Sequence, residues 1–243
     1  MDLVLLHKFA HLIQDSGPLY HEFNPDAWIK EPWNAFSSLF FFVPVLFWTV
    51  KLYGKYMRHG IITLLLPLLF LNGLGSTLYH AFRASDFFLV LDFLPAMIMS
   101  IILSLYMWKV VTGAWWKGMT TVMGFYGVGY LTITLLGPHI PSNATPNIGY
   151  FFSGSCFLLP FLILLVRTRF FKWYLVVLTF VFLIGALLFR MLDYPTPNPF
   201  PEWMPQGTHF LWHIMSALAV FSLGYYLFFL KEQRPDVLES VKS

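Results

Sequence analysis

The sequence predicts an all-α integral membrane protein built as a bundle of seven transmembrane helices. Of the 243 residues, 58% are hydrophobic and only 11% are charged, whereas a soluble domain carries about 25% charged residues. In addition, the chain contains long charge-poor stretches, and a bilayer core about 30 Å thick requires about 20 apolar residues per helix. No segment is both basic and aromatic, so the sequence does not indicate a nucleic-acid partner.

Seven charge-poor apolar stretches of suitable length follow one another along the chain. They cover residues 35–53, 60–82, 87–108, 118–137, 148–166, 173–190 and 207–230. The connections are short, and the breaker-rich stretch GPHIPSNATPN separates the fourth stretch from the fifth. We therefore expect an extramembrane segment at 1–34, a membrane domain at 35–230 and a short tail at 231–243.

The first residues, MDLVLLHKFAHLI, resemble neither a transmembrane span nor a cleaved signal peptide. Their apolar core is short and is interrupted by Lys8 and two histidines. An amphipathic helix that lies in the membrane interface is the expected structure.

The distribution of basic residues predicts the orientation, because lysine and arginine accumulate in cytoplasmic loops. Most of the 15 lysines and arginines fall in the loops after the first, third and fifth stretches and in the tail. The exceptions are Lys8, Lys30, Arg83 and Arg190. We expect the N-terminus outside, in the periplasm or a lumen, and the C-terminus in the cytoplasm. The membrane is then a bacterial inner membrane or that of the endoplasmic reticulum or Golgi.

With this orientation, several polar residues fall into one layer near the outer membrane face. They are Ser76, His80, Asp92, Asp193, His209 and His213. Ionisable residues inside transmembrane segments are costly and mark functional sites. The layer is therefore the candidate active site, with Asp193 expected just past the end of the sixth stretch.

The histidines of this layer have the spacing of metal ligands. His209 and His213 are four residues apart on one helix, so their rings project from the same face. With His80 as a third ligand, one tetrahedral position would stay open for water, as in catalytic zinc sites. The alternative is a set of ordinary, hydrogen-bonded core histidines. The other histidines are expected to be loop residues without such a role: His7, His11, His21, His59 and His139.

Asp92 and Ser76 acquire catalytic roles by elimination. A carboxylate beside an activated water could take its proton and pass it to a leaving amine. Ser76, one turn before His80, could donate a hydrogen bond to a developing oxyanion. Alternatively, Ser76 only bonds a backbone carbonyl of its own helix.

The elements STLYH, VLDFLP and HFLWH, in this order, resemble the alkaline ceramidase branch of the CREST superfamily of membrane hydrolases. The resemblance covers most of the chain. It implies zinc ligation by His80, His209 and His213 and catalysis by Asp92 and Ser76. It also implies the substrate, ceramide or a similar long-chain N-acyl lipid, which is cut at its amide into a sphingoid base and a fatty acid.

The stretch YHEFNPDAWIKEPWNAFSS is similar to the ceramidase segment that holds calcium. The resemblance implies four candidate ligands, Tyr20, Glu22, Asn24 and Glu31, and oxygen ligands suit calcium. This chain departs from the family, because His21 replaces a cysteine, Leu19 replaces a ligand aspartate, and the gap between the two glutamates is shorter. Asp26 could compensate, and an acidic, solvated loop is the alternative.

Other functions remain open at this point. Zinc chemistry serves esters as well as amides, so an acyl-ester lipid hydrolase of the GPI-remodelling type is one alternative. A non-enzymatic heptahelical metal-containing receptor is another, although the charge distribution opposes the inverted orientation of the adiponectin receptors. A metal transporter is disfavoured by the apolar inner halves of the helices. The sequon at Asn143 would lie outside, and no protein partner is indicated.

Overall fold

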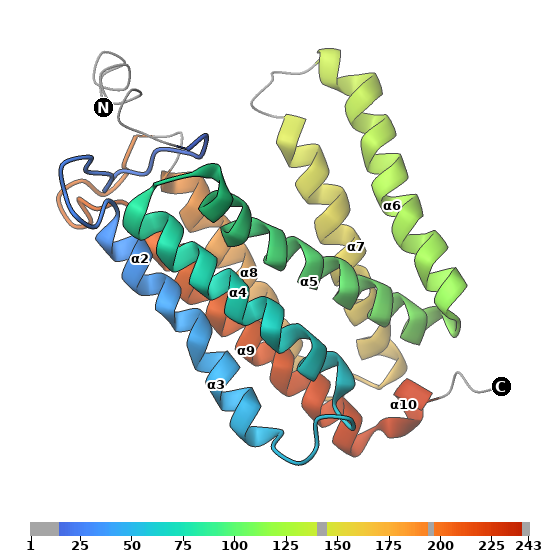
Figure 1. The fold of residues 1–243 in the computed structure, drawn as a ribbon. Coiled ribbons are helices and arrows are strands. Elements are labelled where there is room, and N and C mark those ends of the chain that lie inside the picture. Colours follow the sequence, from blue (N-terminus) through green and yellow to red (C-terminus); the bar gives the residue numbers. More distant parts are fainter. Residues whose placement is uncertain (1–14, 140–144, 194–196, 240–243) are drawn as a thin grey trace. The chain divides into compact units, whose positions relative to one another are not determined.

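The computed structural model describes residues 15–139, 145–193 and 197–239, and every regular element in these ranges is a helix (Figure 1). The elements are α2 (Pro32–Ser38), the 3₁₀ turn η1 (Leu39–Phe41), α3 (Phe42–Lys51), α4 (Gly60–Phe82), α5 (Asp86–Thr112), α6 (Trp115–Leu136), the 3₁₀ turn η2 (Gly137–His139), α7 (Thr145–Arg167), α8 (Trp173–Asp193), α9 (His209–Gln233) and α10 (Pro235–Glu239). The amphipathic helix expected at the N-terminus and the sequon at Asn143 lie outside the described residues.

Six helical segments of the described chain are long and apolar enough to cross a membrane. They are Pro32–Lys51, Gly60–Phe82, Asp86–Thr112, Trp115–His139, Trp173–Asp193 and His209–Gln233. In α7, the apolar segment Phe151–Arg167 is shorter than these six. The fold is thus that of a helical integral membrane protein, and the seventh span and the orientation stay predictions.

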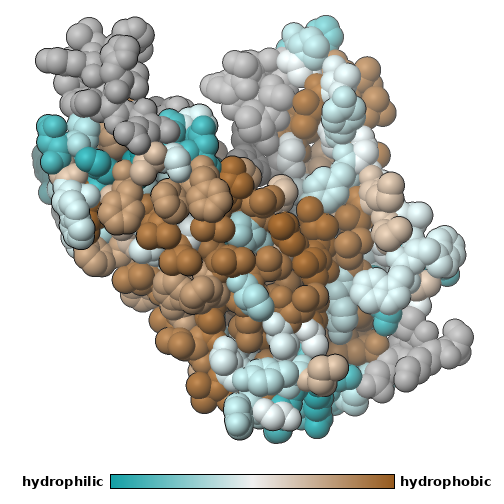
Figure 2. Space-filling view, in the orientation of Figure 1, coloured by the Kyte–Doolittle hydropathy of each residue, from teal (hydrophilic) through white to brown (hydrophobic). Residues whose placement is uncertain are grey.

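Large apolar side chains cover the outside of these helices. On α3 and α4, Leu46 is 66% exposed and Leu64 is 54% exposed. The surface is accordingly hydrophobic along the helices and hydrophilic over the loops near the N-terminus of α2 (Figure 2). Such a surface is unfavourable in water but suits a bilayer. A helix is tolerated there because its backbone N–H and C=O groups are hydrogen-bonded to one another within the helix.

The chain divides into two compact units. The first comprises residues 1–98 and 174–227, and the second comprises 99–173 and 228–243. In the second unit, Trp108 and Val122 pack in a buried cluster around Cys156, and the Trp108 indole N–H donates to the Cys156 carbonyl at 2.8 Å. All candidate site residues belong to the first unit.

The helices of the first unit approach one another closely where the site lies. At Gly75 of α4 a side chain would collide with the backbone carbonyl of Leu91 on α5. Beside this contact, the Asn72 amide donates to the Asp92 carbonyl. Gly75 therefore lets the backbones of α4 and α5 meet. This contact and the Asn72 bond determine which turn of α4 lies beside Asp92 of α5.

The helix bounds differ from the predicted ones at most helix ends, and three of the differences concern how the helices continue or stop. The first span is not a continuous α-helix, because η1 interrupts it. Helix α5 extends beyond both ends of the expected 87–108, since a helix can continue into polar residues past the bilayer core. Asp193 is the last residue of α8, whereas we expected it just past the helix end.

Candidate metal centre

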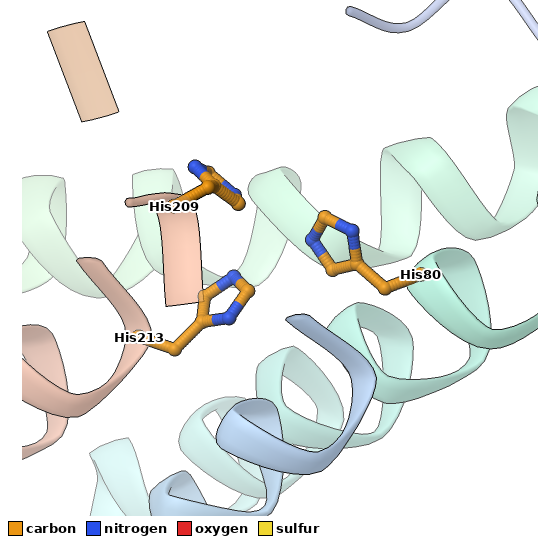
Figure 3. Close-up of side chains that lie close together, drawn as sticks. All are labelled: His80, His209 and His213. Atoms are coloured by element: carbon orange, nitrogen blue, oxygen red, sulfur yellow. The ribbon is translucent and has the colours of Figure 1, made fainter. Parts of the chain in front are cut away.

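Three histidines from two helices converge in the first unit (Figure 3). His80 projects from the last turns of α4, and His209 and His213 project from the first two turns of α9. One potential ligand atom from each ring lies within 4.8 Å of the other two, and all three residues are buried. The structure thus brings the predicted histidines together.

His80 is held by a buried carboxylate. Its Nδ1 lies 2.5 Å from Glu31 Oε2, and both side chains are fully buried. An ionised carboxylate only accepts hydrogen bonds, so Nδ1 carries the proton and the Nε2 lone pair is available. This Nε2 is buried and has no hydrogen-bond partner among the described residues.

His213 is oriented by two serines of α2. Its Nδ1 lies 2.9 Å from Ser37 Oγ and 3.3 Å from Ser38 Oγ. Both hydroxyls donate to the carbonyl of Asn34, at 3.1 and 2.7 Å. Because each hydroxyl has one proton to donate, the serine oxygens act as acceptors toward the ring. His213 therefore donates from Nδ1, and its Nε2 lone pair is also available.

His209 is fixed through its backbone and its ring. The backbone N–H donates to Asp193 Oδ2 at 2.7 Å, and the ring stacks on Tyr20 with centroids 3.7 Å apart. Its Nδ1 is buried and, in the described part of the chain, without a hydrogen-bond partner. A buried imidazole nitrogen that bonds nothing is unusual, because such groups are normally satisfied.

These observations fit a zinc ion. Among the described residues, two of the three rings have a buried nitrogen without a hydrogen-bond partner. The other ring nitrogen of His80 is bonded to a carboxylate, as is typical of metal-bound histidines. Zinc–nitrogen distances of about 2.1 Å would require the rings to close slightly around the ion. Three neutral nitrogen ligands are a donor set that zinc accepts with an open position.

Ser76 and Asp92 lie beside the three histidines. Ser76 Oγ is 3.4 Å from His213 Nε2 and 2.9 Å from Ser38 Oγ, and it is fully buried. The half-buried Asp92 side chain lies close enough to Ser76 to interact with its hydroxyl. The hydroxyl is thus bonded to other side chains, so the alternative of a bond only to its own helix backbone does not describe it.

The side chains of the calcium candidates interact with other groups of the protein. Glu22 accepts the backbone N–H groups of Trp33 and Asn34 at 2.8 and 2.6 Å, and Asn24 accepts the backbone N–H of Asp26 at 3.0 Å. Both oxygens of Glu31 also have donors, and the Tyr20 ring stacks on His209. The side-chain oxygens of Glu22, Asn24 and Glu31 are therefore engaged with N–H groups, which does not fit a calcium ion needing six to eight oxygen ligands.

Glu22 instead caps a helix. Its carboxylate bonds the free N–H groups in the first turn of α2, where negative charge is favourable. Burial nevertheless raises the pKa of Glu22 to about 7, since the two N–H bonds only partly offset the loss of hydration.

Several site residues were not predicted from the sequence. Ser37, Ser38 and Arg83 were overlooked, although two adjacent serines inside an apolar stretch are a signal that could have been used. His21 lies in a turn before α2, as expected of a loop histidine, but its ring also bonds Asp193 at 2.8 Å. His59 is buried rather than solvated.

Comparison with protein-family models and with curated proteins gives no match for this chain.

Proposed function

We propose that this protein is a zinc-dependent membrane amidase that hydrolyses the N-acyl bond of ceramide or a similar long-chain lipid. The observation that carries the proposal is the buried histidine triad with two unpartnered ring nitrogens, set beside a serine and a carboxylate. The order and type of these five residues support the ceramidase resemblance.

The proposed membrane topology has seven spans, with the N-terminus outside and the site in the outer or lumenal half of the bilayer. The positions of His80 near the end of α4 and of His209 at the start of α9 support one common depth. The apolar outer surface of α3 and α4 is compatible with a lipid substrate that arrives from the bilayer.

The chemistry divides among the protein groups. When bound, zinc would supply a water of lowered pKa and polarise the acyl carbonyl. Asp92 takes the proton of the attacking water and returns it to the leaving amine, which makes it base and then acid. Ser76 donates a hydrogen bond to the carbonyl oxygen as negative charge develops there.

The decisive experiment compares wild type with Asp92→Asn on a fluorescent long-chain ceramide in detergent. Asparagine has nearly the same size but cannot accept the proton, so fatty-acid release should disappear while the zinc content stays. Asp86→Asn is the matched control, because Asp86 lies on the same helix and is exposed, with its carboxylate bonded to Ser16. It should retain activity.

Two outcomes would contradict the proposal in different ways. Equal release by wild type and Asp92→Asn would refute the catalytic role of Asp92. Cleavage of an acyl-ester lipid without cleavage of ceramide would refute the substrate and favour an ester hydrolase.

Ser76→Ala tests the second catalytic group. Loss of one oxyanion donor typically lowers turnover about 10²- to 10³-fold. We expect a loss of this size in kcat with little change in zinc content. An unchanged kcat would show that the Ser76 hydroxyl serves only to bond Ser38 and His213.

A further inference from the structure

Arg83 is a buried arginine whose five N–H groups all find acceptors. It follows the last turn of α4 with a left-handed backbone, at φ 49°. Its guanidinium donates to both Asp15 carboxylate oxygens at 2.8 Å, to the carbonyls of Gly17 and Pro18, and to Glu31 Oε1. Since arginine has five N–H donors in a fixed plane, this set of bonds saturates it.

The surroundings of the guanidinium exclude water. The side chains of Arg83, Asp15 and Glu31 are at most 1% exposed. The guanidinium also lies over the rings of Phe23 and Tyr79, at 5.4 and 4.7 Å from their centroids. A buried charge needs this degree of pairing to be tolerated. The acceptors around position 83 therefore suit a side chain that is always positively charged.

We propose that Arg83 is an internal cation that replaces calcium in this chain and positions Glu31 against the metal-ligand histidine His80. The inference rests on the proposed zinc site and adds a positioning residue to it. The chain of contacts runs from the Arg83 guanidinium to Glu31 Oε1, and from Glu31 Oε2 to His80 Nδ1.

The charge balance supports this assignment. Glu31 would otherwise be a buried, unpaired anion beside a neutral imidazole, which is strongly unfavourable. Arg83 pairs with one carboxylate oxygen, and the other oxygen accepts the hydrogen bond from His80 Nδ1. The same guanidinium bonds Asp15, and thereby ties the segment before α2 to the end of α4. Two further bonds join these parts, from the backbone N–H groups of Lys30 and Glu31 to the carbonyls of Ala81 and His80.

A guanidinium and a calcium ion are not interchangeable at this place. Calcium takes six to eight oxygen ligands, whereas the five acceptors around Arg83 each receive one bond from its N–H groups. The position of a family ligand aspartate is Leu19, so the oxygen set is also incomplete. The guanidinium therefore supplies the positive charge beside Glu31 that a bound cation would otherwise supply.

The first test measures zinc affinity by competition with a chelator. Glu31→Gln and Arg83→Met should each weaken zinc binding about 10- to 100-fold, the usual effect of losing a residue that orients a metal ligand. Arg83→Lys should also be impaired, because an ammonium cannot replace five planar donors. Glu22→Gln is the matched control, since it removes a carboxylate of the same segment that does not contact His80.

A structural role alone predicts a different result. In that case Glu22→Gln and Glu31→Gln would lower thermal stability and zinc affinity in parallel. The proposal requires Glu31→Gln to weaken zinc binding more than Glu22→Gln does at equal stability. Equal zinc affinity in wild type, Glu31→Gln and Arg83→Met would overturn it.

The second test uses only the wild-type protein and calcium. Thermal unfolding in detergent with added calcium and with a calcium chelator should give the same midpoint, since a ligand of the folded state would raise it. A midpoint that rises with calcium, or calcium retained after gel filtration, would refute the replacement by Arg83. This result is independent of the zinc site, whereas wild-type protein that binds no zinc would refute the proposed function itself.

Discussion

The Asp193 carboxylate accepts the backbone N–H of His209 at 2.7 Å, so the last residue of α8 caps the helix that carries two of the three histidines. The same oxygen accepts the N–H of Thr208, and the other oxygen accepts two bonds from His21. One buried carboxylate thus determines where α9 begins.

Asp193→Ala should lower the free energy of unfolding by about 1 to 3 kcal/mol, because buried N–H groups lose their acceptor. His209 should also become less well placed, so zinc retention should fall. Chemical denaturation in detergent and elemental analysis measure the two effects. Asp236→Ala, an exposed change in the C-terminal tail, is the control, and equal stability of both variants would contradict the capping role.

Purified wild-type protein should contain one tightly bound zinc per chain, and His213→Ala should lose it. The reason is that two remaining imidazoles hold a zinc ion much less tightly than three. Elemental analysis after dialysis against a weak chelator gives the metal content. His139→Ala removes an exposed histidine and should keep the zinc; full zinc in His213→Ala would show that the ligand set is wrong.

The serine pair of α2 should affect the metal without touching it. The double change Ser37→Ala and Ser38→Ala removes both acceptors of the His213 Nδ1 proton, and we expect zinc affinity to fall about 10- to 100-fold. Chelator competition measures the affinity. Ser222→Ala is the control, because this buried hydroxyl bonds the Leu218 carbonyl within α9 and no site residue among those described. If the double variant matched Ser222→Ala, the serines would not orient the ring.

Gly75→Ala should separate α4 from α5. The added methyl group would collide with the Leu91 carbonyl, and overpacking of this kind costs about 1 to 3 kcal/mol. Asp92 should move away from Ser76, so activity should fall as well as stability. Gly60→Ala, on the same helix with open space around it, should be neutral; similar melting temperatures for both variants would argue against the close contact.

Stability should depend on pH through Glu22. Burial raises the pKa of Glu22 from its ordinary 4.5 to about 7, so the folded state binds the proton more tightly than the unfolded state. Its contribution to stability is complete below about pH 4.5 and is lost as the pH rises through about 7. Melting curves between these values should show a decline that Glu22→Gln removes. Glu202→Gln, at an exposed position, should keep the decline.

The transmembrane helices were predictable because the bilayer demands a long apolar run, and such runs are visible in the sequence. The metal candidates were predictable for a related reason, since polar residues inside these runs are few. The exact helix ends and the residues that hold the metal candidates in place were harder to predict. Helix α5 extends past its apolar part, and Glu31 was expected to bind calcium, whereas its carboxylate bonds His80 and Arg83, 49 and 52 residues away in sequence. Contacts over such separations are not encoded in a local pattern.

The 3₁₀ turn η1 between α2 and α3 changes the angular phase of the first span. A 3₁₀ helix advances 120° per residue and an α-helix 100°, so three residues shift the phase by about 60°. The serines of α2 can thereby face the histidines while Trp48 of α3 is buried against Gly224 of α9. A one-residue insertion in η1 would rotate α2 relative to α3, so that either the serines of α2 or Trp48 of α3 would no longer face α9. The rotation of α2 about the helix axis and that of α3 are therefore set separately, and both depend on the length of η1.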